Sequence, residues 1–156
     1  MFITKNLVNI LGGNISVTSE LGKGSEFKVV LQENLVDTST KLDLSSVNLM
    51  IIHSSNMIRA FLKNSIMKYE IKVNDFSNGV DAINELKKVD YDIVIVDKYI
   101  SDVRVEELVR TIKEDISSNI KIMVIGNQEN IDYVDMFISE ELNMNDIINN
   151  IKKVLS

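Results

Sequence analysis

From Val47 to the end of the chain, short apolar runs alternate with segments of helical periodicity. The run Ile93–Val96 consists only of β-branched apolar residues, which is typical of a strand covered on both faces of a parallel sheet. Regular alternation of strand and helix predicts the α/β class, with a doubly wound five-stranded parallel sheet. The other predicted strands are Asn48–Ile52, Ile71–Asn74, Ile120–Ile125 and Met136–Ile138, and the predicted helices are Ser55–Tyr69, Val80–Lys88, Val105–Lys113 and Asn145–Leu155.

In an open parallel sheet, ligands bind at the edge where the strands reach their carboxyl ends. The residues that follow each apolar run are therefore the candidate functional residues. Polar or small residues follow four of the five runs: His53 and Ser54, Asp97, Gly126, and the segment Ser139–Glu141.

The first 46 residues have a different organisation. Residues 2–11 have the apolar spacing of an amphipathic helix, and strand-like segments follow at Asn14–Glu20 and Glu26–Gln32. We interpret Gly22–Ser25 as the turn of a hairpin, because it lacks the spacing of a phosphate-binding loop. A helix and a hairpin are too small to bury a core of their own. The polar segment 33–46 reads as a linker to a domain at 47–156.

Charge and composition exclude several classes of function. The net charge is −6, and the only basic clusters are two short lysine pairs, so we expect no nucleic-acid partner. Cysteine is absent, which removes thiolate metal sites and cysteine nucleophiles. No apolar run is long enough to span a bilayer. We therefore expect no membrane contact by this segment and a cytoplasmic location.

Residues 47–156 resemble a response-regulator receiver domain of the chemotaxis-regulator type, which has a flavodoxin-like fold. Tyr91–Asp97 is similar to the family's third strand, which ends in the phosphoacceptor aspartate. Ser77–Ala82 is similar to the Asn-Gly entry into the second helix, and Asn145–Leu155 to the last helix. The resemblance implies transfer of a phosphoryl group from a phosphohistidine to Asp97.

The N-terminal part separately resembles the end of a histidine-kinase ATP-binding domain. The similarity runs through Ile3–Val8, Leu11–Val17 and Ser19–Phe27, so residues 1–32 read as a remnant of that domain. A kinase tail, a linker and a receiver follow one another in hybrid sensor histidine kinases. The ATP-binding boxes of the kinase family would lie upstream of Met1, so we expect no nucleotide site and no enzymatic activity in this chain alone.

Most positions that carry receiver chemistry have changed. The family places an acidic pair for a magnesium ion after its first strand, where this chain has His53 and Ser54. It places a hydroxyl after the fourth strand and a lysine after the fifth, where this chain has Gly126 and Glu140. Asp97 survives, but a carboxylate at 140 would repel a phosphoryl group there. We therefore expect a degenerate pseudo-receiver that acts through protein partners, such as a kinase or phosphotransfer domain, without a cofactor.

The alternative is an active receiver that phosphorylates Asp97 with Mg²⁺. Lys98 or Arg104 would then supply a replacement cation. A different cation site formed by Asp97, Glu140 and Glu141 is also open.

One expected helix of the receiver fold has too little room. Only residues 127–135 lie between Gly126 and the strand at Met136, which is enough for a turn or two. We expect the fourth helix to be short or missing, and with it part of the family's output and dimer surface. Proline is absent from the whole chain, and Ser101 and Glu141 stand where the family has prolines near its pocket.

Overall fold

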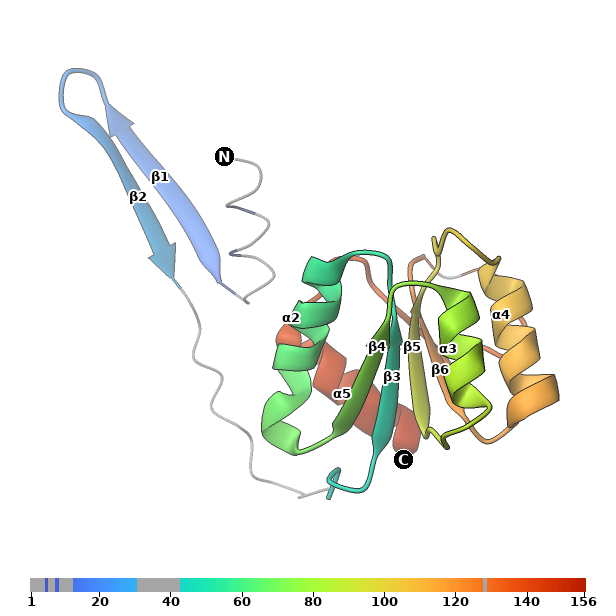
Figure 1. Ribbon diagram of the computed structural model, residues 1–156. Coiled ribbons are helices and arrows are strands. Elements are labelled where there is room, and N and C mark those ends of the chain that lie inside the picture. The colour runs from blue at the N-terminus through green and yellow to red at the C-terminus, as the bar shows by residue number, and fades with distance from the viewer. Residues whose placement is uncertain (1–4, 6–7, 9–12, 31–42, 128) are drawn as a thin grey trace.

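The computed structural model describes residues 5, 8, 13–30, 43–127 and 129–156. Five parallel strands form one sheet in the order β4-β3-β5-β6-β7 (Figure 1). This order confirms the predicted doubly wound sheet, because the chain adds strands on one side of β3 and then on the other. The strands are β3 (Asn48–Ile52), β4 (Lys72–Phe76), β5 (Ile93–Asp97), β6 (Lys121–Ile125) and β7 (Met136–Ile138).

Helices cover both faces of this sheet (Figure 1). On one face, α2 (Asn56–Ile66) and α5 (Met144–Leu155) pack over a core that includes Leu49 and Ile95. On the other face, α3 (Gly79–Leu86) and α4 (Val105–Thr111) pack over a core that includes Val94. The strand β5 is buried along its whole length, as expected for the apolar run at its centre.

Short polar side chains start three of the helices. Ser55, Asn78 and Asn143 each accept a hydrogen bond from a backbone N–H in the first turn of α2, α3 and α5, which is the usual role of an N-cap residue. The helix predicted at Ser55–Tyr69 ends sooner, because α2 passes into a 3₁₀ turn at Met67–Tyr69. The helix α4 continues as a π-helix at Ile112–Ile116.

Among the residues that the structure describes, none between β6 and β7 is helical. Asp135 instead accepts hydrogen bonds from the Ile122 N–H at 2.8 Å and from the Lys113 ammonium at 3.0 Å. The Tyr133 hydroxyl donates to Glu114 at 2.8 Å. These contacts fasten the short connection to the π-helix, and the prediction of a short or missing fourth helix is confirmed.

The N-terminal segment forms a separate antiparallel hairpin of β1 (Asn14–Glu20) and β2 (Gly24–Val30). Its second strand begins two residues before the predicted one, and Gly22 and Gly24 take the positive φ values that the tight turn requires. The helix predicted at 2–11 lies mostly outside the described residues, of which Lys5 and Val8 are helical. Most of the predicted linker also lies outside them. Within the described residues, no helix is long and apolar enough to cross a membrane.

Candidate functional site

Two side chains from neighbouring strands meet at the carboxyl edge of the sheet. Ile52 on β3 pairs with Val96 on β5, so the next residues, His53 and Asp97, lie side by side. The imidazole Nε2 is 3.5 Å from the Asp97 carboxylate Oδ2, and the two side chains are only 14% and 12% exposed. The other carboxylate oxygen accepts the Tyr99 N–H at 3.1 Å. Both carboxylate oxygens of Asp97, the residue at the phosphoacceptor position, thus lie beside nitrogen atoms of the protein itself.

The second ring nitrogen of His53 is also occupied. Its Nδ1 accepts a hydrogen bond from the Ser55 N–H at 2.9 Å, so the ring proton is on Nε2 and faces Asp97. Burial lowers the pKa of His53, the Asp97 carboxylate opposes that shift, and the Arg59 guanidinium adds to it. The imidazole is therefore neutral at pH 7, and neither nitrogen is free to act as a base, a nucleophile or a metal ligand.

Arg59 on α2 holds the segment that follows β3. Its guanidinium donates to the carbonyl oxygens of His53 at 2.6 Å and Ser54 at 3.0 Å. Its Nε donates to the Asp75 carboxylate at the end of β4, at 2.8 Å. Lys63 donates to the other oxygen of Asp75 at 2.7 Å. Hydrogen bonding to Lys63, and then to Arg59, holds the pKa of Asp75 below its usual value despite partial burial.

Gly126 lies against the side chain of Lys98, which fills the place of the missing hydroxyl. A Cβ at Gly126 would come within 3.0 Å of both Cβ and Cδ of Lys98, and the glycine has a φ of 149°. The Lys98 ammonium forms an ion pair with Glu129, which raises the pKa of Lys98. The other predicted replacement cation, Arg104, pairs with Glu107 at 3.1 Å. Both cations are therefore paired with glutamates.

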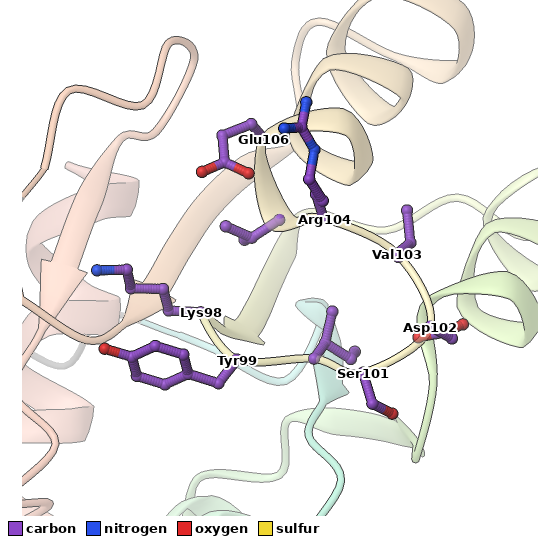
Figure 2. A pocket seen from close by; sticks show the side chains of 9 residues that line it. Lys98, Tyr99, Ser101, Asp102, Val103, Arg104 and Glu106 are labelled. Carbon is purple, nitrogen blue, oxygen red and sulfur yellow. The ribbon is translucent and has the colours of Figure 1, made fainter.

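The loop after Asp97 is fastened to α3. Asp102 accepts the backbone N–H groups of Gly79 at 3.0 Å and Val80 at 2.9 Å. Partial burial raises the pKa of Asp102, but these backbone donors outweigh it and the net shift is downward. The loop surrounds an open hollow of about 450 Å³, and its polar side chains splay around the rim (Figure 2). The Tyr99 side chain is 64% exposed.

The remaining candidate positions do not build a cation site. Ser54, Glu140 and Glu141 are exposed, and the Glu141 N–H donates to the Ser139 hydroxyl. The part of the chain that the structure describes contains no group of three or more histidine and carboxylate side chains able to hold a metal. Magnesium prefers several oxygen ligands in octahedral geometry. The donor set around Asp97 does not fit that ion, since its oxygens already face an imidazole N–H and a backbone N–H.

Comparison with known proteins identifies the family. The response regulator receiver domain family matches residues 49–152, more than half of the chain. The chain belongs to that family. The autoinducer 2 sensor kinase/phosphatase LuxQ of Vibrio vulnificus is 29% identical over 122 residues, covering 72% of this chain and 14% of LuxQ. This receiver therefore spans only a small part of that relative.

Solved structures show the same fold. The chemotaxis response regulator CheY4 of Vibrio cholerae has a TM-score of 0.63 at 13% identity, covering 69% of this chain and 98% of CheY4. The receiver domain of Ssk1, solved with the histidine phosphotransfer protein Ypd1 of Saccharomyces cerevisiae, has a TM-score of 0.61 at 14% identity, covering 68% of this chain and 86% of that one.

Sequence reasoning singled out His53 and Asp97 but not their contact, and it missed Arg59. The sequence did contain a signal that could have identified Arg59. Arg59 lies four residues after the capping Ser55, so its side chain can reach back over the loop after β3, and Asp75 stands near the end of the adjacent strand. Such an arginine is an ordinary surface residue in the sequence pattern alone, because its partners come from three separate segments.

Proposed function

We propose that this receiver is a pseudo-receiver, which takes part in two-component signalling by binding a protein partner without accepting a phosphoryl group. The observation that carries the proposal is the contact between His53 and Asp97. The nucleophilic carboxylate faces an imidazole where a receiver needs a metal ion. The donors that would stabilise the transferred phosphoryl group are replaced by Gly126 and Glu140.

The magnitude of the loss can be estimated. Removing one preorganised donor from an anionic transition state costs about 3–4 kcal/mol. Two such losses amount to about 6–8 kcal/mol, or at least about a 10⁴-fold decrease in rate. The loss of the acidic pair comes in addition. Phosphorylation of Asp97 would then be too slow to operate as a switch.

The partner we propose is a kinase or phosphotransfer domain. The likeness to a sensor kinase/phosphatase and to a receiver solved with a phosphotransfer protein supports this choice. We also propose that the chain is a cytoplasmic piece of a hybrid sensor histidine kinase, with a kinase remnant at 1–32, a linker at 33–46 and the receiver at 47–156. No cofactor is needed for this role.

The test is intact-mass measurement after incubation with a small phosphodonor and Mg²⁺. We expect no gain of a phosphoryl group by the unaltered chain or by Asp97→Asn. A matched positive control restores the charges of the pocket, with His53→Asp, Ser54→Asp and Glu140→Lys in one chain. A phosphoryl gain in the unaltered chain that is lost in Asp97→Asn would refute the proposal and establish the active phosphoacceptor.

A second measurement addresses binding. Titration with a phosphotransfer domain should give the same affinity with and without the phosphodonor. A phosphodonor-dependent change in affinity that requires Asp97 would contradict a phosphorylation-independent role.

A further inference from the structure

A second hollow lies at the edge of the sheet opposite Asp97. Its volume is about 480 Å³, and it is bounded by the end of α3, the residues before β5 and the residues before β6. Tyr91 and Ile120 line it, just ahead of the first residues of those two strands, which places the hollow at the amino edge of the sheet. Sites for small molecules typically have volumes of about 300–1,000 Å³, so this hollow has the size of a ligand site.

A π-helix forms one wall of the hollow. The N–H of Ser117 donates at 2.8 Å to the carbonyl oxygen of Ile112, five residues earlier, and closes the turn of the π-helix Ile112–Ile116. Asp115 and Ser117, at the end of this turn, line the hollow. π-Helices are rare and are found frequently at functional sites. Two independent features, a hollow of ligand size and a rare form of helix, therefore coincide at one place.

The charged side chains that line the hollow are mostly acidic. They are the carboxylates of Asp90 and Asp115 and the ammonium of Lys87, and all three residues are exposed. Within the part of the chain that the structure describes, neither carboxylate takes part in a hydrogen bond or an ion pair. Asp92, by contrast, accepts the N–H of Asn48 at 2.8 Å. The two acids of the hollow are therefore available to a ligand.

The inner lining of the hollow is apolar. Leu86, Tyr91 and Ile120 are each less than 10% exposed. The Tyr91 hydroxyl accepts a hydrogen bond from the Asn74 amide at 2.6 Å, so its polar end already has a partner in the protein. We propose that this hollow binds a small organic cation, an amine whose apolar body lies against the buried side chains and whose ammonium faces the two carboxylates. This inference goes beyond the proposed function, because the site is remote from Asp97.

Other ligand classes match the hollow less well. A metal ion needs several protein ligands, and the described residues contain no group of three or more histidine and carboxylate side chains that could hold one. An anion would meet two carboxylates, Asp90 and Asp115, with only the ammonium of Lys87 to attract it. An organic cation satisfies both the charge of the rim and the apolar interior.

Titration of the full chain with 2-phenylethylamine, followed by the amide resonances in NMR, tests the proposal. Phenylacetate is the matched control, because it has a similar aromatic body and the opposite charge. We expect the amine to give saturable shifts at Tyr91, Ile116 and Ile120, with a dissociation constant on the order of 1 mM because so small a probe makes few contacts. Phenylacetate should give no saturable shift there.

Variants of the charged residues identify the groups that bind. Asp90→Asn and Asp115→Asn each remove one charge at nearly constant size, and each should weaken amine binding by about threefold to fivefold, as for a partly exposed ion pair. Both acids are exposed, so neither change should disturb folding. Lys87→Gln removes a like charge and should strengthen amine binding by about twofold. Glu106→Gln is the control, because it removes an exposed carboxylate at the opposite end of the same helical segment, and it should leave the dissociation constant unchanged.

Four results would overturn the inference: no saturable shift with the amine up to roughly 20 mM, saturable shifts confined to residues outside the hollow, equal binding of phenylacetate, or unchanged affinity when Asp90→Asn and Asp115→Asn are combined. These results are distinct from a failure of the proposed function. Phosphorylation of Asp97 would refute the pseudo-receiver and leave the amine titration as it is. A failed titration would leave the phosphorylation test unaffected.

Discussion

Replacing Gly126 with serine restores the hydroxyl that active receivers carry after the fourth strand of the sheet, and we expect it to destabilise this chain. Gly126 has a φ of 149°, a backbone region that costs a residue with a side chain about 1–3 kcal/mol. The new Cβ would lie 3.0 Å from two carbon atoms of Lys98, closer than the 3.5–4.0 Å of a favourable carbon contact. Lys98 must then move and give up its ion pair with the half-exposed Glu129.

Crowding of this kind adds at least about 1 kcal/mol, so the expected loss in the free energy of unfolding is about 2–4 kcal/mol. Urea denaturation measures it directly. With a slope of about 2 kcal/mol per molar, the midpoint should fall by about 1–2 M. Gly126→Ala should cost as much as Gly126→Ser, because the Cβ is the cause and not the hydroxyl.

A double variant separates the two contributions. Adding Lys98→Ala to Gly126→Ser removes the contact with the Lys98 Cδ but keeps the one with its Cβ, so it should recover only part of the crowding cost and leave the backbone cost in place. Recovery of full stability would show that the φ value of Gly126 contributes nothing. A Gly126→Ser midpoint equal to that of the unaltered chain would refute the reasoning altogether.

The remaining predictions concern three other contacts. His53→Asp places a second carboxylate beside Asp97, so the midpoint temperature of thermal unfolding, measured at pH 7 with a chelator, should fall. Added Mg²⁺ should raise this midpoint again in this variant alone. Burial raises the pKa of Asp135, but the N–H of Ile122 and the neighbouring lysines lower it below its usual value. Its stabilisation is therefore complete above the unfolded pKa and is lost as the pH falls through the lower folded pKa, so Asp135→Asn should flatten the acid limb of urea stability against pH. Gly79→Ala brings a Cβ into a clash with a γ-methyl group of Val103, and calorimetry should show a loss of about 1–3 kcal/mol in the free energy of unfolding.

Much of the fold could be predicted from the sequence because it follows from local patterns. The run Ile93–Val96 is part of the buried strand Ile93–Asp97, and the strand Met136–Ile138 has the predicted bounds. The length of the segment 127–135 was enough to predict that a helix would be short or missing. In each case the information lies in consecutive residues or in their number.

The structural details that the sequence predicted wrongly, or did not predict, depend on residues that are distant in the sequence. The helix predicted at Val105–Lys113 continues instead as a π-helix. The partners of that π-helix, Tyr133 and Asp135, belong to the segment that follows β6 in the chain. The His53–Asp97 contact required the register of β3 against β5, which no local pattern contains. The pairing of Lys98 with Glu129 depends on the conformation of a side chain. Charge and residue type indicated which positions had changed, but not which side chains would occupy the space.

The short connection from β6 to β7 has a consequence for cross-talk between signalling pathways. Cells that carry many receivers must keep homologous domains from pairing with the wrong partner, and a shared helical surface makes such exchange possible. Here the residues of that stretch that the structure describes are not helical, and Asp135 and Tyr133 hold it in place through hydrogen bonds. A domain built this way offers intact receivers no matching helix to pair with. We expect it to be insulated from them by its shape, without any need for charges that repel.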